Sequence, residues 1–406
     1  MYRLFPAPQE ADLIKLVATF AIIFSTLAGR SAVDKVLSLR GGSELVAFWG
    51  QLGSIIDVVA GVALAGVGTG VSVLVAQADR PERQRGLLHQ SLRLGLMVSA
   101  PVMVLVVAVS LALPGALAGA GISQGLVALA AVIGCVAVVP GMVNGYWLGQ
   151  QRRGLMLALA AGTSAALLAA ALAASQAQVL AALALAQGLP ALAAMAALCG
   201  AASDGDYGAL RRYIPPGLAI GLLTPLSMVA VRDIVSIHMS WHDVGLIQAL
   251  WRVSDWVASV ASGVMAVYFL PRLSAAHGTP RFAQELRRAG LVTLVPSAIA
   301  LFALGALHRP VFSLLYDPSF LMSGATVALF FAGTLVRIAS WLPLYALYAM
   351  RRTGPLVVGE FLSMPLFAAL LAAYPWPLSL EAAGALWVAA YTGYALFNLW
   401  AMRRGA

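Results

Sequence analysis

Long apolar runs alternate with short polar gaps along this chain, and this alternation restricts it to a helical membrane protein. Apolar residues make up 61% of the 406 residues and charged residues only 10%, and the mean hydropathy is +0.89. A water-soluble globule needs far more polar surface. Since about 20 apolar residues span the hydrocarbon, we predict an all-α integral membrane protein with about twelve transmembrane helices. The predicted spans are 12–38, 45–76, 87–113, 122–149, 155–175, 178–201, 216–237, 244–270, 289–307, 321–349, 355–374 and 380–402.

The 25 lysines and arginines are divided unevenly between alternate gaps. If successive spans alternate in direction, 18 of them fall on one side of the membrane, and only Lys35, Arg40 and Arg309 fall on the other. Positively charged loops remain in the cytoplasm. The distribution therefore predicts a multi-pass membrane protein with both termini cytoplasmic, and we expect no nucleic-acid partner.

One polar, turn-rich gap, residues 203–217, divides the twelve spans into six and six. We predict two six-helix bundles around a central cavity, a plan in which transporters commonly place their site between paired halves. The expected parts are an N-terminal bundle at 1–202, a cytoplasmic linker at 203–215 and a C-terminal bundle at 216–406.

The charged residues within the predicted spans include Arg30, Asp57, Arg232, Asp233, Arg252, Asp255, Arg337 and Glu360. Facing lipid, they would cost on the order of 20 kcal/mol together, so each must face a partner or water. Arg30 precedes Asp57 in the first half much as Arg232 precedes Asp255 in the second, which indicates an internal duplication. The steps between Gln248, Arg252, Asp255, Ser259 and Ser262 place them on one helix face, as expected for a cavity wall.

Two interpretations of these buried charges remain open. They can neutralise one another as interhelical salt bridges, and Arg252 can even pair with Asp255 in its own helix. Alternatively, the arginines surround a positive, water-filled lumen suited to phosphate, because arginine stays charged and binds oxygens bidentately. A stripe of Arg337, Trp341 and Tyr345 also has two interpretations, since it can form a binding surface or serve interface anchoring and packing.

Several other functions lack their sequence signals. No Gly-Lys-Ser/Thr motif is present, so the chain has no ATPase of its own. Gly66, Gly68 and Gly70 lie within a span, where close helix packing explains them better than a dinucleotide loop. The five histidines are scattered and both cysteines fall within spans, so we expect neither a metal site nor a cofactor.

Four segments resemble one family of bacterial transporters. The central one, SWHDVGLIQALWRVSDWVASVASGVMAVYFLPRLSAA at 240–276, resembles the seventh-to-eighth helix region of O-antigen and enterobacterial common antigen translocases. WGQL with the later VAQ at 75–77, NGYWLGQQRRG at 144–154 and LVRIAS at 335–340 resemble other parts of that family. The chain departs from the pattern at Thr334, where the family often has an acidic residue, and at Ile247, where it has Trp.

This resemblance implies a flippase of the multidrug, oligosaccharidyl-lipid and polysaccharide exporter superfamily, and not an enzyme. The implied cargo is an oligosaccharide on undecaprenyl pyrophosphate, moved from the cytoplasmic to the periplasmic leaflet of the bacterial inner membrane. We expect the protein to act as a monomer, with membrane lipid and glycan polymerases as partners. We expect Arg30, Arg232, Arg252 and Arg337 to bind the pyrophosphate. The sugar would contact Gln51, Gln248, Trp251, Trp341 and Tyr345, and Asp57, Asp255 and Glu360 would serve charge relay or gating.

Three other functions remain as alternatives. A drug or cation antiporter of the same superfamily would need an acidic cavity without paired arginines. A flippase for another lipid-linked precursor is closer in chemistry. A membrane enzyme, such as a glycan polymerase or ligase, would need a sizeable outward loop, and the outward gaps are short.

Overall fold

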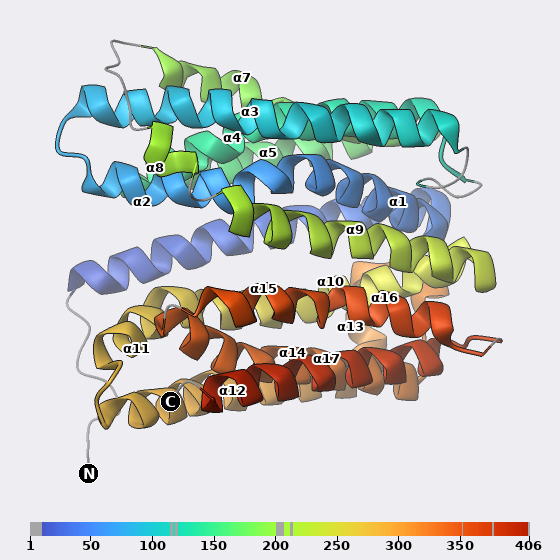
Figure 1. Cartoon of the computed structure of the whole chain (residues 1–406). Helices are drawn as coiled ribbons and strands as arrows, with labels where there is room; N and C mark the ends of the chain where they lie inside the picture. The colour runs from blue at the N-terminus through green and yellow to red at the C-terminus, as the bar shows by residue number, and fades with distance from the viewer. Residues whose placement is uncertain are drawn as a thin grey trace.

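The computed structural model is helical throughout the residues it describes, which are 10–113, 117, 121–199, 207–211, 214–350, 352–375 and 377–404 (Figure 1). The first half contains α1 (Glu10–Ala63), the π-helical turn η1 (Leu64–Gly68), α2 (Thr69–Gln77), α3 (Pro81–Ala112), α4 (Gln124–Gly149), α5 (Arg153–Ala173), α6 (Val179–Gly188), α7 (Pro190–Met195) and η3 (Ala196–Leu198). The second half contains α8 (Tyr207–Arg211), α9 (Ile214–His238), α10 (Trp241–Val264), the π-helical turn η4 (Met265–Phe269), α11 (Leu270–Ala276), α12 (Arg281–Ala306), α13 (His308–Leu315), η5 (Pro318–Phe320), α14 (Gly324–Ala349), α15 (Thr353–Phe361), α16 (Met364–Ala373) and α17 (Leu380–Arg403).

The prediction of about twelve spans in two bundles is confirmed. Among the described residues, 9 helical runs are long and apolar enough to cross a membrane. The first run contains two limbs, because Gly41 and Gly42 leave the helical conformation and fold α1 back on itself. With those limbs counted separately and α9 and α17 added, the described chain makes the twelve crossings expected from the sequence.

Some predicted boundaries differ from the structure, and prolines account for two of the differences. The span predicted at 178–201 is divided where Pro190 begins α7, and the span at 355–374 is divided at Leu362 and Ser363, just before Pro365. The helix predicted at 289–307 begins earlier, at Arg281, because its polar first turns remain helical beyond the apolar run. Part of the predicted linker, at 203–206, 212 and 213, lies outside the described residues, and its remainder includes α8.

Serine side chains cap four helices that begin at the end of the molecule away from the basic loops. The hydroxyls of Ser123, Ser240, Ser323 and Ser379 each accept a hydrogen bond from the backbone N–H three residues later, at the start of α4, α10, α14 and α17. Such caps satisfy backbone donors that have no partner within the helix.

Glycines bring the two halves into close contact along α1 and α9. A Cβ atom on Gly221 of α9 would lie 2.0 Å from the carbonyl oxygen of Gly61, so only glycine fits there. Gly66 lies against Gly217 of α9 in the same way, which agrees with the packing role predicted for the glycine run. Each half also has a π-helical turn in its second crossing, η1 and η4, and this shared irregularity agrees with a duplicated plan.

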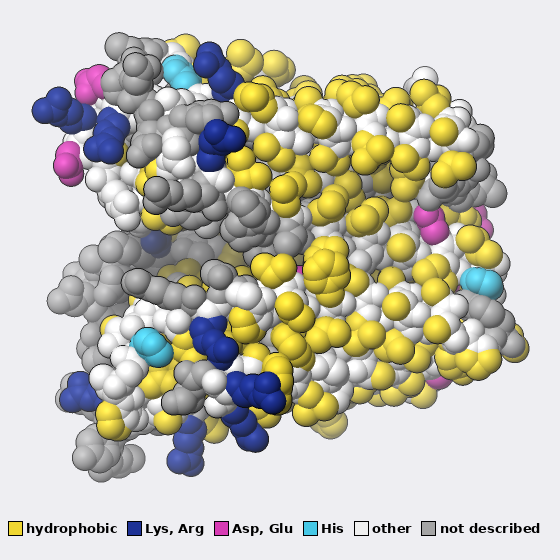
Figure 2. Space-filling model, in the orientation of Figure 1, with side chains coloured by type: hydrophobic (Ala, Val, Ile, Leu, Met, Phe, Trp, Pro, Cys, Tyr) yellow, Lys and Arg dark blue, Asp and Glu magenta, His cyan; other side chains and the backbone are white. Residues whose placement is uncertain are grey.

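Basic side chains gather at one end of the bundle, where the turns α2–α3, α4–α5 and α11–α12 lie (Figure 2). Between the two lobes, the surface is hollowed at this same end. Arg3, Arg212 and Arg351 lie outside the described residues. The alternation of basic and neutral turns is therefore visible in the fold for the part of the chain that is described.

Candidate functional site

A cavity of about 170 Å³ lies between the two lobes near the middle of the helices. Both limbs of α1 form one side of it, α9 and α10 form the other, and α6 contributes a single glutamine. Its charged and amide-bearing lining residues are Arg30, Asp57, Gln187, Arg232, Gln248, Arg252 and Asp255. Six of these seven were singled out from the sequence, and the fold brings them together.

Arg232 of α9 is held in this cavity by neutral groups. Its guanidinium donates to the Ser54 hydroxyl at 2.7 Å and to Gln248 Oε1 at 2.7 Å, and it lies 5.9 Å from the Trp251 ring centroid. No carboxylate oxygen of the described residues lies within 4.0 Å of its nitrogens, and its buried Nε has no hydrogen-bond partner there. Trp251 Nε1 is also a buried donor without a partner among the described residues. Two residues that line one small cavity therefore each carry a buried N–H donor without a partner among the described residues.

Arg30 and Asp57 lie on the two limbs of α1, and both are exposed although they are at mid-helix depth. In the described part of the chain, Arg30 forms no ion pair and no hydrogen bond through its guanidinium. Charges exposed at this depth without a direct ion pair require water, so these residues indicate a hydrated cavity.

Arg252 is paired across the lobes. Its Nε donates to Asp34 Oδ2 at 2.7 Å, and the Asp34 side chain is 1% exposed. Arg337 of α14 donates to Asp255 Oδ1 at 3.0 Å, with both side chains about one-quarter to one-third exposed. Asp255 thus pairs with another helix, and the pair within α10 suggested by the sequence spacing is not formed. The two interpretations of the buried charges both apply, since two arginines are paired and two are not.

The remaining predicted site residues lie away from the cavity surface in this conformation. Gln51 is fully buried and donates to Asp233 Oδ1 at 3.0 Å and to the Leu117 carbonyl at 3.1 Å. Trp341 lies 5.5 Å from the Arg337 guanidinium, and Tyr345 donates to the Ser262 carbonyl at 3.5 Å. Glu360 is the penultimate residue of α15, which forms the first part of a crossing that is divided at Leu362 and Ser363.

Three polar residues of the site were not singled out from the sequence. Asp34 lies one helical turn after Arg30, a spacing that identifies a common face. Ser54 lies midway between Gln51 and Asp57 at steps of three, which also places it on their face. Gln187 had no signal of this kind, because its neighbours in sequence are apolar or small.

A second polar cavity, of about 300 Å³, extends the site into the first lobe. It shares Arg30, Asp57 and Gln187 with the central cavity and adds Asn144, whose buried Oδ1 has no partner among the described residues. The hydrated region therefore continues from the space between the lobes into the interior of the first lobe.

The lobes are fastened together at the end opposite the basic turns. Lys35 of α1 donates to the Tyr316 carbonyl at 2.7 Å, and Ser43 and His242 Nδ1 share a hydrogen bond of 2.6 Å. The Phe48 and Trp241 rings pack at a tilt of 59° with their centroids 4.9 Å apart. These contacts close one end, and the hollow in Figure 2 lies at the other.

Comparison with known sequences gives two similar curated proteins. The lipid III flippases of Escherichia coli strain K12 and of Shigella flexneri are each 26% identical to this chain over 270 residues. Each match covers 60% of the chain and 62% of the relative, so it spans less than two thirds of those proteins. No family model matches the sequence.

Solved structures with the same fold are transporters and a lipid flippase. An inward-facing multidrug resistance MATE family transporter of the MOP superfamily superposes with a TM-score of 0.72 at 14% identity, over 96% of this chain and 97% of its own. The lipid II flippase MurJ, in an inward closed conformation, gives 0.70 at 12% identity, over 96% and 87%. An outward-facing MATE structure gives 0.65 at 13% identity, over 96% and 95%. The chain thus shares the fold of these solved structures, and the resemblance seen in its sequence agrees with its similarity to the lipid III flippases.

Proposed function

We propose that this chain is a flippase of the bacterial inner membrane that moves an oligosaccharide linked to undecaprenyl pyrophosphate from the cytoplasmic to the periplasmic leaflet. The observation that carries the proposal is the pair of arginines, Arg30 and Arg232, that face the central cavity without a carboxylate within 4.0 Å among the described residues. A cavity with free guanidinium donors favours an anionic group. The names of the lipid III flippases support a lipid-linked cargo.

The pyrophosphate would bind where donors are already in place. Arg30, Arg232 Nε and Trp251 Nε1 supply N–H groups without partners within the described residues. Arg252 and Arg337 are held by Asp34 and Asp255. On binding, the headgroup would compete with those carboxylates for the two arginines. This exchange avoids an uncompensated positive cluster when no cargo is bound.

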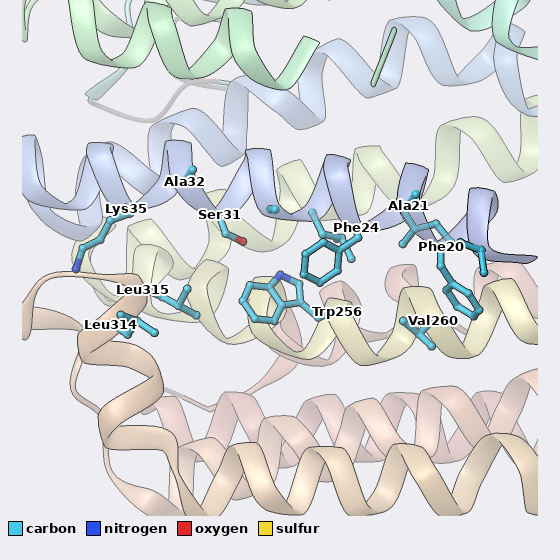
Figure 3. A pocket seen from close by; sticks show the side chains of 14 residues that line it. Phe20, Ala21, Phe24, Ser31, Ala32, Lys35, Trp256, Val260, Leu314 and Leu315 are labelled. Carbon is cyan, nitrogen blue, oxygen red and sulfur yellow. The ribbon is translucent and has the colours of Figure 1, made fainter. Parts of the chain in front are cut away.

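The polyprenyl tail would leave the cavity through the side of the molecule. An apolar groove of about 740 Å³ lies between the first limb of α1 and α10, with α13 at one end (Figure 3). Phe20, Phe24, Trp256 and Val260 line it. Since Arg30 and Asp255 directly precede Ser31 and Trp256 of this groove in the chain, α1 and α10 contribute to both sites. A charged headgroup could thus lie in the central cavity while the apolar tail passes through the groove into the lipid.

The sugars would occupy the hollow that opens between the lobes at the basic end. Gln248 and Trp251 line the cavity and offer an amide and a flat ring to a glycan. Rocking of the two lobes about the bound headgroup would then expose it at the other end, after Lys35 and Ser43 release Tyr316 and His242.

Reconstituted transport tests the function directly. Proteoliposomes that contain the full chain and a fluorescent oligosaccharide on polyprenyl pyrophosphate should make the glycan accessible to a membrane-impermeant lectin with time. Liposomes without protein are the control. If the glycan stays on its original side while a cationic dye is exchanged for protons, the chain is a drug antiporter and the proposal fails.

Filling the cavity should stop transport without disturbing the fold. Gly53 lines the cavity, and a Cβ atom there would meet no atom within 4 Å. Gly53→Leu should therefore reduce glycan translocation in proteoliposomes by about tenfold or more. The leucine side chain would exclude the headgroup from the cavity, so Arg232 could not donate hydrogen bonds to the phosphate. Gly354→Leu is the matched control, because Gly354 is exposed on α15 and also has open space. Equal rates for both variants would show that cargo does not enter this cavity.

A further inference from the structure

A furrow on the outer face of the first lobe takes no part in the proposed transport cycle. It lies between α5 and the α6–α7 crossing and has a volume of about 600 Å³. Leu155 and Leu189 border it and are 42% and 51% exposed, so it opens to the lipid. Its inner wall, formed by Leu159, Thr163 and Pro190, also lines the second polar cavity of the first lobe. Its position is therefore that of a site for a membrane component.

Small residues give this furrow its depth. On the α5 side, Ala158, Gly162 and Ala166 recur at steps of four and line it. On the opposite side, Ala193, Ala196 and Ala197 line it. A Cβ atom on Gly162 would meet no atom within 4 Å, so the space above it is open. The walls are apolar enough to receive a hydrocarbon chain.

The furrow has a cation at the end that carries the basic turns. Arg152 lines it and is exposed, and its guanidinium has no hydrogen bond or ion pair with the described residues. The turn holds this residue in place, because the Arg152 backbone N–H donates to the Trp147 carbonyl at 2.8 Å and Gln151 adopts a left-handed φ of 60°. Trp147, 8% exposed, lines the same end. An exposed cation thus stands at the mouth of an apolar furrow.

We propose that this furrow binds an anionic phospholipid, with one acyl chain between α5 and α7 and its phosphate on Arg152. A phospholipid supplies the apolar and the anionic part in one molecule, whereas an apolar partner helix would leave Arg152 without a counterion. The site is separate from the cavity that contains Arg232, so its occupancy does not depend on the proposed cargo.

Native mass spectrometry of the full chain in detergent tests this site. The probes are phosphatidylglycerol and phosphatidylcholine with identical acyl chains. The wild type should retain phosphatidylglycerol in preference. Arg152→Gln should weaken phosphatidylglycerol binding about fivefold, as expected for one basic residue at a membrane surface. It should weaken phosphatidylcholine binding less, because the choline cation offsets the charge of that lipid's phosphate. Gly162→Leu should weaken the binding of both lipids.

Two matched variants control for general effects. Arg281→Gln removes an exposed charge at the start of α12, outside the furrow, and Gly154→Leu adds the same side chain to α5 at another open position. Both should bind lipid as the wild type does. Equal retention of the two lipids by the wild type, or unchanged binding in Arg152→Gln and Gly162→Leu, would overturn the proposal. A lipid-free dimer that Gly162→Leu dissociates would assign the furrow to a second copy instead.

Discussion

Replacing Arg30 by glutamine should reduce transport of the lipid-linked glycan by about tenfold to a hundredfold, which is the range for loss of a hydrogen bond to a charged group. Arg30 is exposed in the cavity and has no hydrogen bond or ion pair with the described residues. Its guanidinium therefore stabilises no folded contact, and the thermal unfolding midpoint in detergent should stay the same. Initial translocation rates in proteoliposomes measure the first effect.

Arg93→Gln is the control for that experiment, because Arg93 is exposed on α3 and lies outside the cavity. It should transport at the wild-type rate. If Arg30→Gln also transports normally at equal reconstituted amounts, Arg30 does not bind the cargo. If it unfolds at lower temperature, its charge is structural and the rate alone decides nothing in favour of the proposal.

Removing either partner of the Arg252–Asp34 pair should destabilise the fold more than any other change at the site. The Arg252–Asp34 pair joins the lobes at 2.7 Å, and Asp34 is 1% exposed. Asp34→Ala and Arg252→Ala should each cost about 3–5 kcal/mol, because each leaves one buried charge without its partner. The double variant should cost less than the sum of the two, and this coupling can be measured by denaturation of all four proteins in detergent.

The pair Arg337–Asp255 provides the comparison within the same molecule. Its side chains are 26% and 35% exposed, so its coupling should be no more than about 1 kcal/mol. Equal coupling for the two pairs would contradict the difference in burial. Because Arg252→Ala combines a loss of stability with a loss of charge, transport by that variant alone is a poor test of cargo binding, whereas Arg30 lacks this ambiguity.

Much of the fold could be predicted because lipid imposes simple rules on sequence. Membrane crossings need long apolar runs, and basic residues collect in alternate turns. Both the positions of the helices and their order along the chain could therefore be predicted from the sequence. The cost of buried charge also identified Arg232, Arg252 and Asp255 as residues that must meet a partner or water. Gly41 and Gly42 separate the first two predicted spans, as the kink in α1 requires.

The pairing of those charges could not be predicted from spacing. Asp255 lies three residues after Arg252, yet it pairs with Arg337, because α14 brings a guanidinium closer than the side chain in the same helix does. Arg252 instead reaches Asp34 of the other lobe. Likewise, Gln51 looked like a sugar contact but is fully buried against Asp233, since helix rotation decides which polar face meets the cavity.

Equilibrium binding to three lipid-linked glycans tests the central claim most directly. The same oligosaccharide would be attached to polyprenyl pyrophosphate, polyprenyl monophosphate or neutral polyprenol, and binding to the detergent-solubilised chain would be measured with the wild type and with an Arg30→Gln/Arg232→Gln variant. If the unpaired arginines bind the headgroup, affinity should fall with each phosphate removed, and the double variant should lose most of this dependence on phosphate. Equal affinity of the wild type for the pyrophosphate and the neutral carrier would contradict the account.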